Sequence, residues 1–167
     1  MPPLRGGDER VLLSTWLDFQ RETLALKCAG LGEEELRRAS VEPSIMSLLG
    51  LVQHMEAVER NWFQQVVAGR DAPWQDAEGN GFMVPEERTA GEVVASWREE
   101  LERSREVFVA AGALDRECAL VEQRMIEALG DTHVTLRWII VHLIGEYARH
   151  NGHADLLRER ADGATGF

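Results

Sequence analysis

The sequence predicts an all-α protein, a four-helix bundle in which one or two of the connections between helices are long. Four segments repeat apolar residues at the spacing of three and four that is typical of an amphipathic helix. No stretch shows the sustained alternation of apolar and polar residues that a strand with one exposed face requires. The connections between the four segments differ in length, and four amphipathic helices joined in this way predict a four-helix bundle.

The first predicted helix spans about residues 8–29. Spacings of four, three, four and three predict that its buried face carries Leu12, Trp16, Phe19, Thr23 and Leu26. Gly30 and Gly32 follow this segment, and we expect them to end the helix.

The second predicted helix begins after Pro43, where Ser44 is placed to cap it, and continues to Gly69. Its apolar stripe consists of Ile45, Leu48, Val52, Met55, Trp62 and Val66. Residues 70–88 then contain glycine and proline among acidic residues, which predicts a long surface loop. Because this loop carries Trp74 and Phe82, we expect it to cover part of a site.

Thr89 and Glu92 form the capping-box pattern at the start of the third predicted helix, which ends near Gly112. Its buried stripe would be Val94, Trp97, Leu101 and Phe108. Residues 113–132 stay unassigned, because 118–121 suit a short strand and 123–129 suit a short helix. The fourth predicted helix spans about residues 134–160 and carries Leu136, Ile139, Ile140, Leu143, Tyr147, Ala154 and Leu157.

Composition predicts one soluble domain over residues 1–167, because 44% of the residues are apolar and 28% are charged. The net charge of −11 would repel a phosphate backbone, so we expect no nucleic-acid partner. The N-terminal sequence lacks the apolar core of a signal peptide, and the aliphatic stretches are too short to span a bilayer. We therefore expect a cytoplasmic protein without a membrane partner, in which the isolated Cys28 and Cys118 are small buried hydrophobic residues.

Titratable residues cluster in the fourth predicted helix, where Glu146 and His150 lie four residues apart on one face. Glu146 falls on the apolar stripe, and an unpaired buried carboxylate would cost several kcal/mol. His54 lies at the edge of the apolar stripe of the second helix, so it is a third candidate ligand. Two imidazoles and one carboxylate leave coordination positions open, which is typical of a catalytic metal ion. Hydrogen-bonded core residues would show the same spacing.

Three sequence motifs carry a resemblance to a known family: VQHMEAVERNWF at 52–63, LRW at 136–138 and GEYARHNGHADLLRE at 145–159. They resemble the DinB-like superfamily of four-helix-bundle metalloproteins. The resemblance implies a divalent metal held by one residue of the second helix and two of the last, here His54, Glu146 and His150. The glutamate in the middle position is similar to the mycothiol-dependent branch, which includes maleylpyruvate isomerase.

A composition rich in Ala, Arg and Gly indicates a bacterial protein, for which the resemblance implies mycothiol as the thiol. We expect a divalent metal, Zn, Ni or Fe, because these ions accept imidazole and carboxylate ligands. The expected enzyme uses mycothiol or another low-molecular-weight thiol to attack a small-molecule electrophile. The isomerases have an additional C-terminal domain, so we expect a thiol S-transferase here. A metal-dependent hydrolase and a non-catalytic, stress-related metal-binding module stay open as alternatives. The five Trp residues also leave room for an apolar interface in a homodimer.

Other charged residues have predicted roles outside the metal ligands. Glu59 lies on an apolar stripe, and we expect it to form a buried ion pair with Arg149, Arg137 or Arg158 rather than to act as a catalytic acid.

Residues around the predicted ligands also have predicted roles. His153 and Asp155 are expected either to orient a ligand histidine or to cap a bend at residues 151–152. His142, one turn before Glu146, is expected to hydrogen-bond to it.

Overall fold

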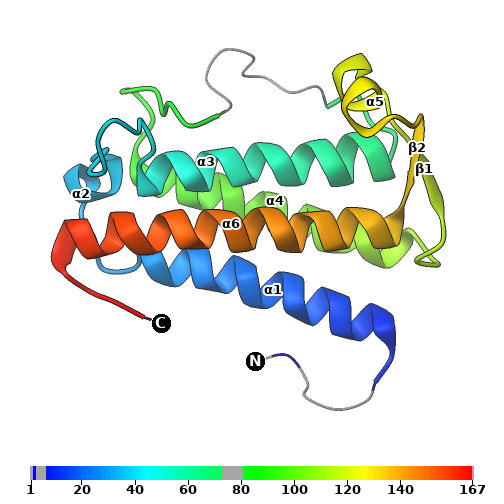
Figure 1. The fold of residues 1–167 in the computed structure, drawn as a ribbon, viewed down its shortest axis with the longest axis horizontal. Coiled ribbons are helices and arrows are strands. Elements are labelled where there is room, and N and C mark those ends of the chain that lie inside the picture. The colour runs from blue at the N-terminus through cyan, green and yellow to red at the C-terminus, as the bar shows by residue number, and fades with distance from the viewer. Residues whose placement is uncertain (1, 3–6, 73–80, 167) are drawn as a thin grey trace.

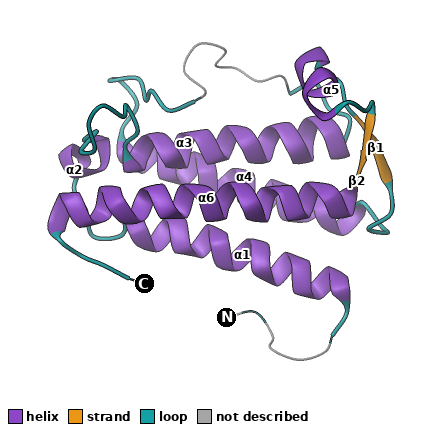
Figure 2. Ribbon diagram, viewed as in Figure 1, coloured by secondary structure: helices purple, strands orange, loops and turns teal. Residues whose placement is uncertain are grey.

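The computed structural model describes residues 2, 7–72 and 81–166, and these form a helical bundle (Figure 1). The long helices are α1 (Glu9–Cys28), α3 (Leu48–Glu59), α4 (Ala90–Ala110) and α6 (Leu136–Asp162). A π-helix, η1 (Arg60–Val67), continues α3 without a break. The shorter elements are α2 (Glu33–Arg37), β1 (Glu117–Ala119), α5 (Gln123–Leu129) and β2 (His133–Thr135). The predicted all-α bundle is confirmed, and Figure 2 shows that strands make up little of it.

The four long helices lie side by side with α6 between α1 and α3, and α4 lies behind them in Figure 1. Helix α6 packs mainly against α1, and α3 packs mainly against α4. Helices α3 and α6 also pack against each other, and their line of contact is called the seam below. None of the helices described is long and apolar enough to cross a membrane.

Helix α3 begins later than predicted, because Ser47 rather than Ser44 caps it. The Ser47 hydroxyl oxygen accepts a hydrogen bond from the Gly50 amide at 3.0 Å. Ser44 belongs to a turn in which its amide donates to the Val41 carbonyl at 2.9 Å. Ile45 consequently lies outside the helix and is 60% exposed, so its assignment to the buried stripe was wrong.

The buried face of α1 also differs from the prediction. Trp16 and Leu26 are 41% and 58% exposed, whereas Leu17, Arg21 and Leu24 face the core. The second stripe has equally good helical spacing, but a charged arginine in its middle made it appear polar in the sequence. The predicted face was therefore wrong at Trp16 and Leu26 but right at Thr23, which is 6% exposed, and the rest was missed because one core position is occupied by an ion-pair partner.

That ion pair joins Arg21 to Glu59 across the core. The Nε and Nη2 atoms of Arg21 donate to the two carboxylate oxygens of Glu59 at 2.8 and 2.7 Å. The two side chains are only 3% and 0% exposed. A buried ion pair at Glu59 was correctly predicted, but its partner is none of the three arginines proposed. Arg149 pairs instead with Glu146, Arg137 pairs with Glu9 and Asp115, and Arg158 pairs with Asp162.

The connection between α4 and α6 contains both elements that the sequence left open. Strand β1 pairs antiparallel with β2, with Cys118 opposite Val134, and α5 lies between the two strands in the chain. Strand β2 was not predicted, because three residues are too few to show a period. Helix α2 was missed for the same reason, since it has only five residues.

Candidate metal centre

Three side chains meet in the seam between α3 and α6. His54 comes from α3, and Glu146 and His150 come from successive turns of α6. Each offers one potential ligand atom, and these atoms all lie within 4.8 Å of one another. His54 and His150 are buried, and Glu146 is half-buried. The structure therefore brings together the three residues that were predicted as metal ligands.

The His150 imidazole is held in its neutral form. Burial lowers the pKa of His150 to about 3, and the nearby His54 and His153 rings add to this effect. A neutral imidazole keeps a lone pair for coordination, whereas a protonated imidazole has none. His150 is therefore ready to act as a ligand at neutral pH.

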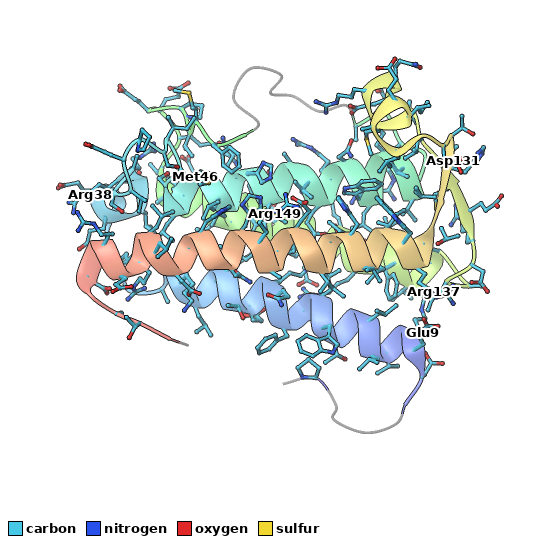
Figure 3. The ribbon with its side chains drawn as sticks, viewed as in Figure 1. Glu9, Arg38, Met46, Asp131, Arg137 and Arg149 are labelled. Carbon is cyan, nitrogen blue, oxygen red and sulfur yellow. The ribbon has the colours of Figure 1, made fainter. Side chains whose placement is uncertain are left out.

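Glu146 differs from the prediction because its carboxylate has a cationic partner. Arg149 Nη1 lies 3.1 Å from Glu146 Oε1, and the Arg149 side chain is 64% exposed. Figure 3 shows Arg149 near the middle of the seam. The expectation that Glu146 would be uncompensated without a metal ion was therefore wrong. A metal ion is indicated by the three ligand atoms that lie close together, and not by an unpaired charge on Glu146.

His153 contacts the second ring nitrogen of a predicted ligand. Its Nδ1 lies 3.3 Å from the Nδ1 of His150, so one of these nitrogens carries the shared proton. The Nε2 of His150 lies 3.7 Å from Glu146 Oε2 and faces the candidate centre. We assign the proton to His150 Nδ1, which leaves Nε2 free to coordinate.

The other predicted supporting roles near this position were wrong. Asp155 forms an ion pair with Lys27 at 2.7 Å instead of contacting a histidine. Helix α6 runs through residues 151–152 without a break, so there is no bend to cap.

Replacing His153 with alanine is expected to weaken metal binding by about 10–100-fold, the usual effect of removing an outer partner of a ligand histidine. The His153→Gln variant should retain most of the affinity, because its carbonyl oxygen can still accept from His150. Competition with a chromophoric chelator would measure both constants. Equal loss in the two variants would show that His153 acts only through packing.

Residues 81–83 cover the His54 side of the centre. The Phe82 ring stacks on the His54 imidazole with 4.3 Å between centroids and an interplanar angle of 20°. Gln53 Nε2 donates to the carbonyls of Gly81 and Met83 at 2.9 and 3.0 Å, which holds this stretch on α3. The expectation that loop 70–88 covers a site is therefore met at Phe82, whereas Trp74 lies outside the described residues.

Two glycines allow this stretch to approach α3 closely. A Cβ atom on Gly50 would clash with the backbone carbonyl of Phe82. A Cβ atom on Gly81 would lie 3.2 Å from the Cα of His54, and Gly81 has a φ of +80° that disfavours other residues. Neither contact was recognised in the sequence, because the two partners of each lie about 30 positions apart.

An aromatic cluster lies next to the centre along the same seam. The His142 ring stacks on Trp138 with 4.9 Å between centroids and an interplanar angle of 8°. The Trp62 ring lies 5.0 Å from His142. The predicted role of His142 as a hydrogen-bond partner of Glu146 is thus replaced by stacking. Burial lowers the pKa of His142, so this ring is also neutral.

Comparison with known families agrees with this geometry. Residues 12–163 match the family model of the mycothiol-S-transferases. The chain belongs to this family. The matched region contains nearly all of α1, the whole of α3, α4 and α6, and the three candidate ligands. The resemblance to the mycothiol-transferase branch of the DinB-like superfamily is thereby confirmed. No curated protein matches the sequence.

Proposed function

We propose that this member of the mycothiol-S-transferase family is a metal-dependent thiol transferase acting on a small-molecule electrophile. The observation that carries the proposal is the convergence of His54, Glu146 and His150 in one seam of the bundle. The proposed cosubstrate is mycothiol, or a related low-molecular-weight thiol, in accordance with the family.

The three donors suit a divalent cation such as Zn, Ni or Fe. Imidazole and carboxylate both bind these ions, at about 2.0–2.2 Å for zinc, so small side-chain rotations suffice to bring the three atoms onto one ion. One carboxylate ligand compensates at most one of the two charges of a dication, so the ion would keep part of its positive charge. A cation held there would supply the positive charge that lowers the pKa of a bound thiol. Three protein donors also leave room for that thiol.

The cysteines of the chain are unsuited to be the nucleophile. Burial raises the pKa of Cys28 to about 12, and burial also raises the pKa of Cys118. Both thiols are therefore protonated at neutral pH, and only a thiolate is strongly nucleophilic. Cys118 is buried as predicted, whereas Cys28 is half-buried.

The nucleophilic sulfur must then arrive with the cosubstrate. In the proposed reaction, its thiolate forms a carbon–sulfur bond with the electrophile. The leaving group departs with the electron pair of the bond that breaks, and the thiol proton is released to water.

A conjugation assay tests the proposal. The metal-loaded protein should join mycothiol to 1-chloro-2,4-dinitrobenzene with release of chloride, and the rate should vanish in the Glu146→Ala variant. The double variant Cys28→Ser and Cys118→Ser should keep its activity, because neither thiol ionises. Loss of activity in a folded double variant would assign the nucleophile to the protein. If no thiol supports turnover, the hydrolase or the non-catalytic metal-binding function would replace this proposal.

A further inference from the structure

The aromatic cluster of Trp62, Trp138 and His142 contains no predicted metal ligand, although it borders the candidate centre. Trp62 comes from η1, and Trp138 and His142 come from successive turns of α6. Glu146 follows His142 by one further turn, which is about 6 Å along the helix axis. A small molecule that reacts at the centre can therefore also contact the cluster.

The three rings hold one another in place. The His142 and Trp138 rings are stacked, with an interplanar angle of 8°. The Trp62 ring contacts both, with 5.5 Å between centroids to Trp138 and 5.0 Å to His142. Trp62 is only 5% exposed, so it anchors the stack from the η1 side of the seam. The cluster is therefore a preorganised aromatic surface rather than a set of independent side chains.

The cluster is accessible at Trp138, which is 37% exposed. The candidate centre is accessible next to it. Of the three candidate ligands, only Glu146 is not fully buried. The Phe82 ring lies against the other two, with 4.3 Å between centroids to His54 and 5.7 Å to His150. Among the residues that the structure describes, the open end of the centre is thus the Glu146 end, which borders the cluster.

The cluster carries no net charge. Burial lowers the pKa of His142, and the opposing effects of Glu146 and Arg149 on this pKa are smaller. Glu146 and Arg149 also pair with each other at 3.1 Å. A ligand therefore gains most from flat contact with the rings, and it needs no charge of its own.

We propose that the Trp138–His142 stack binds the electrophile of the transferase, and that this electrophile is a flat, uncharged, electron-poor aromatic compound. An electron-poor ring stacks well on an electron-rich indole, because the quadrupoles of the two rings are opposite in sign. The proposal rests on the proposed transferase activity for the role of the ligand as a substrate. Binding to the stack does not require turnover.

The reaction also demands an electron-poor ring. The thiolate sulfur forms a carbon–sulfur bond at the ring carbon that bears the leaving group. The leaving group departs with the electron pair of its bond, and the thiol proton is released to water. Electron-withdrawing substituents stabilise the negative charge that enters the ring during this substitution. Binding to the stack and reactivity therefore select the same class of compound.

The binding test compares nitrobenzene with nitrocyclohexane, which share a nitro group and a six-carbon ring but differ in planarity. Zinc-loaded, ¹⁵N-labelled protein is titrated with each compound in the absence of thiol, and the signals of the five indole N–H groups are followed by NMR. The Trp138 signal should shift with nitrobenzene, whereas the signal of Trp16, which is 41% exposed on α1, should not. Nitrobenzene should bind about fivefold more tightly than nitrocyclohexane, the usual contribution of one aromatic pair.

Three variants locate the site. Trp138→Leu should abolish the preference for nitrobenzene, and Trp138→Phe, which keeps an aromatic ring, should retain most of it. Trp16→Leu is the matched control, because Trp16 is similarly exposed and contacts Phe19 edge to face with 5.8 Å between centroids. The control variant should keep the full preference.

Turnover supplies a second readout. In Trp138→Leu, the KM for 1-chloro-2,4-dinitrobenzene should rise about fivefold with little change in kcat, the size of one aromatic pair. The KM for iodoacetamide, which has no ring, should stay the same. Equal binding of the two probes, a preference that survives Trp138→Leu, or an equal rise of both KM values would each overturn the inference. A preference that depends on Trp138 without turnover of either electrophile would support the aromatic surface and overturn the transferase function.

Discussion

Replacing His150 or His54 with alanine is expected to reduce bound metal from about one ion per chain to almost none. Each substitution removes one of three donors that meet within 4.8 Å. The loss of affinity should exceed the 10–100-fold that follows removal of an outer partner. Helical content should hardly change, since alanine is the best helix former. Elemental analysis after gel filtration and far-UV circular dichroism would measure the two quantities.

His133 supplies the matched control for these substitutions. It is exposed on β2, and its Nδ1 contacts the hydroxyl of Thr132 at 3.0 Å. His133→Ala removes the same chemical group and should leave metal content unchanged. Stoichiometric metal in both the His54→Ala and the His150→Ala proteins would show that the ion lies elsewhere.

The candidate centre was largely predictable because its spacing is local. Glu146 and His150 are one turn apart on a single helix, so their common face follows from helical geometry alone. His54 could be added because it lies at the edge of an apolar stripe, and residues there border a neighbouring helix. The prediction that the helix of His54 lies against the helix of Glu146 and His150 depended on the resemblance to a known family, because an apolar stripe does not show which helix it packs against.

The parts that could not be predicted depend on contacts between distant residues. Arg21 and Glu59 are 38 positions apart in the sequence. The helical period does not show which of several arginines is the buried partner of Glu59. The packing of Phe82 on His54 requires a glycine at position 50, whose role appears only when the loop backbone lies on α3. Both Ser44 and Ser47 are suitable helix caps in the sequence. The Ser44 amide donates to the Val41 carbonyl in a turn, so the helix begins only after Ser47, whose hydroxyl accepts from the Gly50 amide.

The Glu59→Leu variant is expected to lose about 3–5 kcal/mol of unfolding free energy, the usual effect of removing one member of a buried ion pair. Arg21 would then stay 3% exposed with only the partly exposed Asp18 as its carboxylate partner. The pKa of Tyr147 should fall as well, because burial and the Glu59 carboxylate together raise it well above the usual value and the substitution removes the carboxylate. Urea denaturation followed by tryptophan fluorescence would measure the loss.

Two companion variants separate the ion pair from a general effect of losing a glutamate. Glu34→Ala removes the partner of Arg38 in a surface pair whose side chains are 90% and 46% exposed, and should cost less than about 1 kcal/mol. The double variant Arg21→Met and Glu59→Leu should recover most of the stability, since an apolar pair of similar volume removes the stranded charge. If Glu59→Leu is no more destabilising than Glu34→Ala, the pair contributes nothing to holding α1 against α3. If the double variant is as unstable as Glu59→Leu, the loss comes from packing around Glu59 rather than from an unpaired guanidinium.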